Sequence, residues 1–230
     1  MSDANEKITE FILQYNKNKK CLILVDGNNF YHSIKRLGIK LNFEESVKLH
    51  AQILNLLCKA TLKSEIKYYT ANPNMKLEPE EYSKKQKFLA ALKQKIPNLI
   101  ISLGRLAYFE TKEIILKKTT EINVANFDGN KNQILEFCKT CIGKTIKKEK
   151  KSDVNICIDL IECAMSKNTD LCYIFSGDAD IVPAIKMVKK HWPNILLINV
   201  AVDKSSAFEL RQTCHNYIIL HEQNLLALSK

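Results

Sequence analysis

Apolar runs of strand length alternate with segments of helical periodicity along most of the chain. Residues 21–25, 171–175 and 195–200 are nearly continuous in apolar side chains, which is typical of parallel strands covered on both faces. Residues 43–62 and 78–95 instead carry apolar side chains at the spacing of an amphipathic helix. This alternation predicts an α/β fold, a Rossmann-like three-layer α/β/α sandwich with a mainly parallel central sheet.

Residues 99–103 are predicted to form a further strand that ends at Gly104. Residues 105–150 follow the alternation least well. Residues 108–118 alternate as an edge strand of a hairpin would, and residues 131–151 carry seven lysines against two glutamates. We expect a small basic β or loop insertion around 105–150. The predicted organisation is a peripheral N-terminal helix or extension at 1–20, the main domain at 21–222 and a C-terminal tail at 223–230.

The overall charge is strongly basic. Lysine and arginine number 35 against 25 acidic residues, a formal charge of +10 with a sequence pI near 9.1. Such a balance fits an anionic partner, most commonly nucleic acid. The alternative is that lysine is the default surface residue of this protein, since only three of the 35 basic residues are arginines. Neither a signal peptide nor an apolar run of about 20 residues occurs. We therefore expect no membrane association, a cytoplasmic location and reduced cysteines.

Acidic residues follow two of the apolar runs. Asp26 ends the first run, and Asp178 and Asp180 follow residues 171–175 after a Ser-Gly break. Each aspartate alone would be read as a turn residue or a helix cap. However, ligands of open α/β sheets bind at the carboxyl ends of strands, and Asp153, at the start of a predicted helix, is a further candidate. Together they predict an acidic cluster at that edge.

Carboxylates that converge without a basic partner repel each other, and a hard divalent cation such as Mg²⁺ or Mn²⁺ relieves that repulsion. We expect Asp26, Asp153 and Asp178 to hold the cation, with Asp180 orienting the attacking water. Asp159 is about 120° around the same helix from Asp153, so the two cannot share one face. No glycine-rich phosphate loop occurs, which disfavours a nucleotide cofactor.

Cys138 and Cys141 form a C-x-x-C-x-G knuckle. One such pair is half of a tetrahedral zinc site, and no second cysteine or histidine pair lies nearby in the sequence. A structural Zn²⁺ and an accidental spacing therefore both stay open for these two cysteines.

Five segments are characteristic in order and spacing: residues 25–29 (VDGNN), 68–71 (YYTA), 85–92 (KQKFLAAL), 149–156 (EKKSDVNI) and 176–185 (SGDADIVPAI). Together with Gly104, they resemble the NYN domain family of PIN-like nucleases, and within it the bacterial LabA-like group. The resemblance implies a PIN-like fold and metal-dependent ribonuclease activity. It implies an acidic cluster of Asp26, Asp153, Asp178 and Asp180, supported by Asn29 and Ser176, while Asp159 matches an acid of some relatives.

The predicted function is hydrolysis of RNA phosphodiester bonds. The alternative is a catalytically weak RNA-binding or regulatory protein of the same fold, which the intact acid set disfavours. The expected partner is single-stranded RNA, and a homodimer is an assembly compatible with this prediction. The candidate phosphate contacts are Lys147, Lys148, Lys150 and Lys151.

Overall fold

The computed structural model describes residues 3–110, 145–202 and 208–229. The chain divides into two compact units. The first consists of Met1–Gly104 together with Lys151–Lys230, and the second is Arg105–Lys150.

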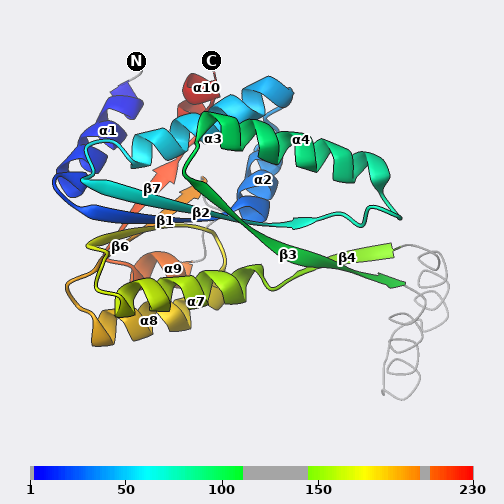
Figure 1. Ribbon diagram of the computed structural model, residues 1–230. Coiled ribbons are helices and arrows are strands. Elements are labelled where there is room, and N and C mark those ends of the chain that lie inside the picture. Colours follow the sequence, from blue (N-terminus) through cyan, green and yellow to red (C-terminus); the bar gives the residue numbers. More distant parts are fainter. Residues whose placement is uncertain (1–2, 111–144, 203–207, 230) are drawn as a thin grey trace, which may run out of the picture. The chain divides into compact units, whose positions relative to one another are not determined.

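A mainly parallel sheet forms the centre of the first unit (Figure 1). Five of its strands pair in parallel in the order β2-β1-β5-β6-β7, and β3 lies next to β2. The predicted fold class is thereby confirmed. The strands are β1 (Lys20–Asp26), β2 (Lys63–Asn72), β3 (Leu99–Glu110), β5 (Leu171–Phe175), β6 (Leu196–Val202) and β7 (Asn216–Leu220).

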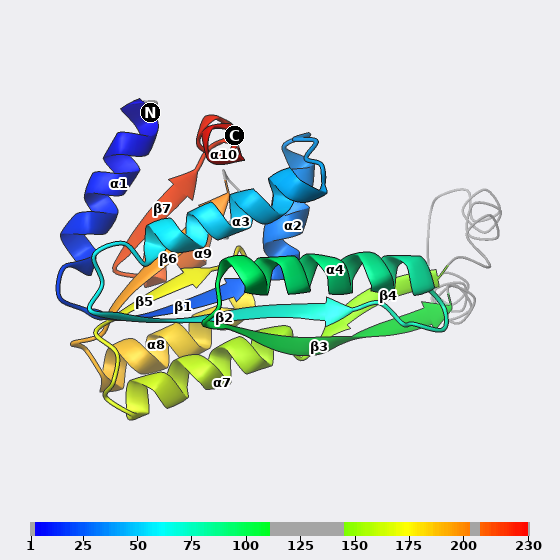
Figure 2. The same ribbon diagram turned by 45° about the horizontal axis from the view of Figure 1, so that its top comes forward.

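Helices cover both faces of this sheet, so the unit has three layers (Figures 1 and 2). One face carries α1 (Asp3–Asn16), α2 (Gly27–Arg36), α3 (Phe43–Leu57), α4 (Pro79–Lys95) and α10 (Glu222–Ser229). The other face carries α7 (Ser152–Met165), α8 (Val182–His191) and α9 (Phe208–Thr213).

The continuous apolar character of the central strands follows from this layering. Along β1, Ile23 and Val25 contribute to the core under the first group of helices, while Leu22 and Leu24 contribute to the core under α7 and α8. Successive side chains of a strand point to opposite faces. A strand covered on both faces therefore has no position at which a polar side chain would meet water.

The terminal helices are joined to the rest of the unit by buried polar contacts. The Asn16 amide at the end of α1 donates to the Leu57 carbonyl over 2.8 Å and accepts from the Tyr173 hydroxyl over 2.9 Å. In α10, the buried Asn224 amide donates to Asn5 Oδ1 over 2.7 Å. Both helices therefore pack as part of the α/β unit.

The second unit contains an antiparallel ribbon. From Arg105 on, β3 pairs with β4 (Thr145–Lys150). The prediction that this strand stops at Gly104 was wrong, because pairing with β4 carries β3 on to Glu110. Lys147, Lys148 and Lys150 are on β4, and all three are exposed. The proposed zinc knuckle, Cys138 and Cys141, lies outside the described residues.

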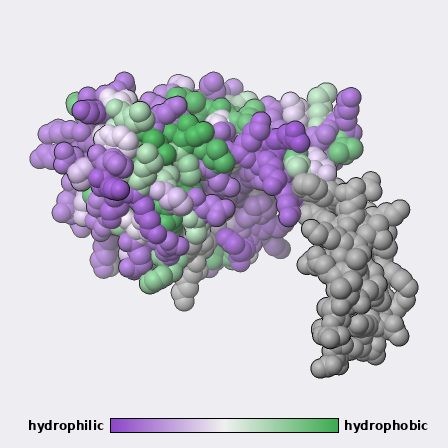
Figure 3. All heavy atoms as spheres, turned by 90° about the horizontal axis from the view of Figure 1, so that it is seen from below, coloured by the Kyte–Doolittle hydropathy of each residue, from purple (hydrophilic) through white to green (hydrophobic). Residues whose placement is uncertain are grey.

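The outer face of α7 exposes apolar side chains. Val154, Ile158 and Met165 are 60%, 48% and 61% exposed, and Figure 3 shows apolar side chains gathered on the face that includes this helix. Within the described part of the chain, neither α7 nor any other helix is long and apolar enough to cross a membrane.

His50 of α3 is a buried titratable group among aromatic rings. Its ring lies 4.4 Å from that of Phe30 and 5.0 Å from that of Phe88, centroid to centroid. Nδ1 donates to the Ser46 carbonyl over 2.7 Å, and Nε2 has no hydrogen-bond partner among the residues that the structure describes. Burial, together with the smaller effect of nearby Lys85, lowers the pKa of His50 to about 4, although the hydrogen bond to Ser46 opposes this shift. The ring is therefore neutral at pH 7.

We expect acid to destabilise the protein through His50. In the unfolded chain the imidazole takes up a proton below its ordinary pKa of 6.5, whereas the buried ring stays neutral until the pH approaches about 4. The unfolded state binds more protons in this window, so the free energy of unfolding falls there by about 3 kcal/mol. Urea unfolding near neutral pH and at about pH 4.5 should show a smaller loss for His50→Phe than for wild type. Equal losses would contradict this assignment.

Candidate metal centre

Three carboxylates converge beyond the end of β5. Asp153, Asp178 and Asp180 each offer one oxygen, and the three oxygens lie within 4.8 Å of one another. Asp153 is in the first turn of α7. Asp178 caps the short 3₁₀ helix η1 (Ala179–Ile181), and Asp180 lies inside it. This group, called the acidic trio below, joins residues that are 25 positions apart in the sequence.

The turn after β5 holds two members of the trio in place. The Asp178 carboxylate accepts a hydrogen bond from the Asp180 backbone N–H over 2.9 Å, and the Asp178 N–H donates to Ser176 Oγ over 3.1 Å. Pro183 follows in the first turn of α8, where the missing N–H costs little. Local hydrogen bonding thus fixes the turn while leaving the second oxygen of Asp178 outside these bonds.

The residue before α7 has an unusual backbone conformation. Ser152 is already helical, and the preceding residue, Lys151, has φ of 85° and makes no capping side-chain hydrogen bond. A lysine in the left-handed region is strained by roughly 1 kcal/mol. This strained residue lies two positions before Asp153, and such strain often occurs next to functional sites.

Asp26 is placed beside the trio and not within it. The side chain is 5% exposed. One of its oxygens accepts from the Asn29 backbone N–H over 2.9 Å, which caps α2, and the other accepts from Ser176 Oγ over 3.2 Å. From the sequence we expect Asp26 to bind the cation together with Asp153 and Asp178. The structure brings Asp180 together with them instead, because the Asp26 carboxylate is turned toward the first turn of α2 and the Ser176 hydroxyl.

Ser176 and Asn29 connect the segments around the centre. The Ser176 hydroxyl contacts both the Asp26 carboxylate and the Asp178 N–H. Asn29 Oδ1 accepts from the Gly177 N–H over 3.1 Å, which ties α2 to the turn after β5. Both residues therefore hold the turn that carries Asp178.

Gly27 permits the close approach of α2 to β2. A Cβ atom at this position would overlap the ring of Tyr68, which is itself buried. Burial raises the pKa of Tyr68, and neighbouring Asp26 raises it further, so the phenol stays protonated. Any larger residue at position 27 would force either the buried Tyr68 ring or the turn at Asp26 to move.

Asn199 is a site residue that sequence reasoning missed. The side chain is fully buried in β6, and its amide donates to the carbonyls of Ile174 and Ser176, both over 3.0 Å. It thereby fixes the point at which β5 ends and the acidic turn begins. The available signal was a single polar residue inside the apolar run of β6 (LLINVAV).

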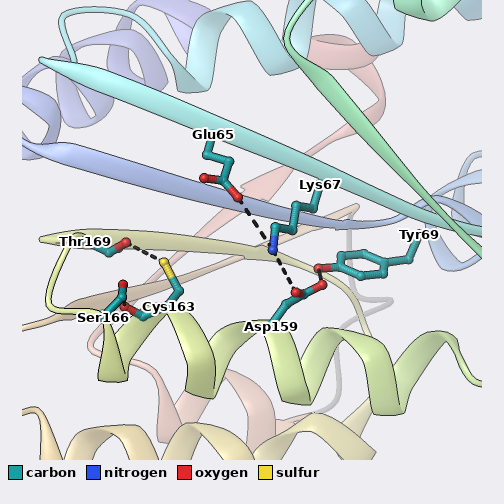
Figure 4. A network of polar contacts seen from close by, with 7 residues as sticks. All are labelled: Glu65, Lys67, Tyr69, Asp159, Cys163, Ser166 and Thr169. Atoms are coloured by element: carbon teal, nitrogen blue, oxygen red, sulfur yellow. Dashed lines mark hydrogen bonds and ion pairs between the residues drawn. The ribbon is translucent and has the colours of Figure 1, made fainter.

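Asp159 belongs to a different network, between α7 and β2 (Figure 4). It accepts from Lys67 Nζ over 2.7 Å and from the Tyr69 hydroxyl over 2.6 Å, and Glu65 lies 3.5 Å from the same ammonium. Burial raises the pKa of Tyr69, and Asp159 adds to the rise. Asp159 is thus outside the trio and fastens α7, which carries Asp153, to the sheet.

The chemistry of the trio fits a hard divalent cation. All three donors are carboxylate oxygens, the ligand type that Mg²⁺ and Mn²⁺ prefer. Within the described ranges, neither Asp178 nor Asp180 forms an ion pair with lysine or arginine. Cys157 lies nearby, but burial raises the pKa of its thiol and the trio raises it further. A thiolate nucleophile is therefore disfavoured here.

Comparison with known proteins supports the fold and identifies the family. A crystal structure of a protein of unknown function from Vibrio parahaemolyticus is similar, with a TM-score of 0.55 and 16% identity over 89% of this chain and 94% of that one. This likeness bears on the fold alone. A search of curated proteins gave no significant match. The model of the NYN domain matches residues 20–222, and the chain therefore belongs to the NYN domain family of PIN-like nucleases.

Proposed function

We propose that the protein is a divalent-metal-dependent ribonuclease that hydrolyses RNA phosphodiester bonds at the acidic trio. The observation that carries this proposal is the convergence of three carboxylate oxygens within 4.8 Å in a chain of the NYN domain family. The trio lies beyond the carboxyl end of β5, the edge at which open α/β sheets bind ligands.

The residues of the chain divide into ligands and positioning groups. Asp153, Asp178 and Asp180 would hold Mg²⁺ or Mn²⁺, which, when bound, supplies an activated water and offsets negative charge on the phosphate. The Asp26 carboxylate accepts a hydrogen bond from the Ser176 hydroxyl, and the same hydroxyl oxygen accepts one from the Asp178 N–H. Asn199 and Asn29 fix the same turn from β6 and α2. These contacts keep the carboxylates in place before substrate arrives.

Four lysines are candidate contacts for the RNA backbone. Lys147, Lys148 and Lys150 are exposed on β4 of the second unit, and exposed Lys151 directly precedes α7. We expect RNA affinity to fall with salt by about 0.7 logarithmic units per phosphate contact. Changing all four lysines to glutamine should flatten the slope of log affinity against log salt by up to about 3. An unchanged slope in fluorescence anisotropy titrations would mean that they form only a solvated surface.

The test of the proposed activity is incubation of the full chain with end-labelled single-stranded RNA and Mn²⁺. Cleavage is expected on a denaturing gel, and excess EDTA should stop it. Asp178→Asn controls for a contaminating nuclease. RNA that is bound but stays intact with Mn²⁺ or Mg²⁺ would support the alternative, an RNA-binding or regulatory protein. The LabA-like subgroup, the cytoplasmic location and the homodimer remain predictions.

A further inference from the structure

The outer face of α2 combines aromatic and basic side chains beside the acidic centre. Gly27, Phe30, Ser33 and Ile34 are buried in this helix. The opposite side is exposed, and Tyr31 is 55% exposed. The helix contains no acidic residue. The exposed residues, called the α2 strip below, are Tyr31, His32, Lys35 and Arg36.

The α2 strip is continuous with the centre through the first turn of the helix. Asn29 contacts Gly177 in the turn that carries Asp178, and Asn28 accepts from the Thr70 hydroxyl over 2.8 Å. Residues three and four apart are neighbours on a helix surface. Tyr31 and His32 therefore adjoin Asn28 and Asn29, and Lys35 and Arg36 follow one turn further on.

The charges on the strip are available to an anionic ligand. Among the described residues, Lys35 forms no ion pair. Arg36 donates a hydrogen bond to the Ser33 hydroxyl over 3.0 Å. This bond positions the guanidinium, whose other N–H groups can donate to a phosphate. With two cations and no carboxylate on the helix, the strip is complementary to a polyanion.

The aromatic part of the strip is suited to an unpaired base. The ring of Tyr31 meets that of His32 edge to face, with centroids 5.4 Å apart, so His32 contacts it in a tilted orientation and does not cover it by stacking. An exposed aromatic face beside cations is the arrangement with which proteins bind single-stranded nucleic acid, by stacking bases and contacting the backbone. Bases of a duplex are already stacked and paired, so this feature selects single strands.

We propose that the α2 strip binds single-stranded RNA next to the cleavage site, with one base stacked on Tyr31 and the backbone contacted by Lys35 and Arg36. This inference rests on the proposed function for the identity of the polymer. A protein partner fits less well, because the strip is small and carries charge of one sign. The strip would direct the strand from the second helical turn of α2 toward the acidic trio.

Binding measured without hydrolysis tests the strip directly. Labelled single-stranded RNA would be titrated with the full chain in EDTA, by fluorescence anisotropy. Tyr31→Ala should weaken binding about tenfold, within the range for loss of one stacked base, whereas Tyr31→Trp should retain affinity. Tyr217→Ala is the matched control, since Tyr217 on β7 is 52% exposed and should have no effect.

An abasic oligonucleotide separates stacking from charge. Its affinity should be unchanged by Tyr31→Ala but still reduced by the double variant Lys35→Gln, Arg36→Gln. The proposal would be overturned if Tyr31→Ala bound normal RNA with wild-type affinity. It would also be overturned if Tyr31→Ala weakened binding of the abasic oligonucleotide as much as binding of normal RNA. The titration in EDTA measures binding without hydrolysis. If the α2 strip binds RNA as expected but the protein does not cleave RNA in Mn²⁺, the proposed nuclease function is refuted and the α2 strip is not. If Tyr31→Ala binds and cleaves RNA as well as wild type, the role of the α2 strip is refuted and the nuclease function is not.

Discussion

Asp178→Asn is expected to abolish RNA hydrolysis, lowering the rate by about a hundredfold or more. Asp178 supplies one of the three carboxylate oxygens of the trio, and asparagine offers a neutral and much weaker ligand to a hard cation. The substitution keeps an oxygen that can accept from the Asp180 N–H, the bond that caps η1. The loss therefore reports on the chemistry of the site and not on an unfolded turn. Mn²⁺-dependent cleavage of labelled RNA measures it.

The same variant is expected to melt later than wild type when metal is absent. Removing one charge from three converging carboxylates relieves their repulsion, and a gain of about 1 kcal/mol raises the melting temperature by about 2–4 °C in a chain of this size. Glu81→Gln is a suitable control, because Glu81 is an exposed carboxylate paired with Lys84. Added Mn²⁺ should then stabilise wild type more than Asp178→Asn. Earlier melting of the metal-free variant would contradict a repulsive acidic site.

The layers of the fold were predictable because burial on both faces leaves a clear pattern in the sequence. Residues 21–25 and 171–175 are continuously apolar, and both form central parallel strands, β1 and β5. The helix from Pro79 to Lys95 was likewise predicted with its bounds, since Pro79 and two glutamates stand at its start. In each case the residues of the segment itself, through their apolar pattern or their helix-start residues, determine its structure.

Features decided by partners distant in sequence were not predictable in this way. Gly104 suggested the end of a strand, but pairing with β4, about 40 residues later, continues β3 to Glu110. Asn199 is a single polar residue in an apolar run, and its role became clear only from its hydrogen bonds to the carbonyls of Ile174 in β5 and of Ser176 in the turn that follows. The left-handed Lys151 also lacks a sequence signal, because residues other than glycine rarely adopt that conformation.

The acidic residues themselves were identified from the sequence, but their grouping required the structure. Position at a strand end indicates that Asp26 and Asp178 share an edge of the sheet. It does not indicate which way a carboxylate turns. Asp26 directly precedes α2, and its carboxylate accepts a hydrogen bond from the Asn29 backbone N–H in the first turn of that helix. This bond competes with a metal for the same oxygen.

Asp180→Asn is therefore expected to weaken Mn²⁺ binding more than Asp26→Asn does. Asp180 contributes an oxygen to the trio, so its loss leaves two carboxylates for the cation. Both oxygens of Asp26 already accept hydrogen bonds, from Asn29 and Ser176. Asparagine at position 26 would disturb that arrangement and, through Ser176, the Asp178 turn. Groups that orient metal ligands in this manner typically change affinity by about 10–100-fold when replaced.

Calorimetric Mn²⁺ titrations of the two variants, with cleavage assays on the same preparations, separate these roles. Asp180→Asn should lose measurable metal binding together with hydrolysis. Asp26→Asn should retain binding weakened about tenfold, and should recover part of its cleavage rate at high Mn²⁺, because saturating the site compensates for lower affinity. Ser176→Ala, which removes the hydroxyl between Asp26 and Asp178, should behave like Asp26→Asn and not like Asp180→Asn. If Asp26→Asn instead abolishes binding while Asp180→Asn keeps it, Asp26 is a direct ligand and its bonds to Asn29 and Ser176 rearrange when the cation enters.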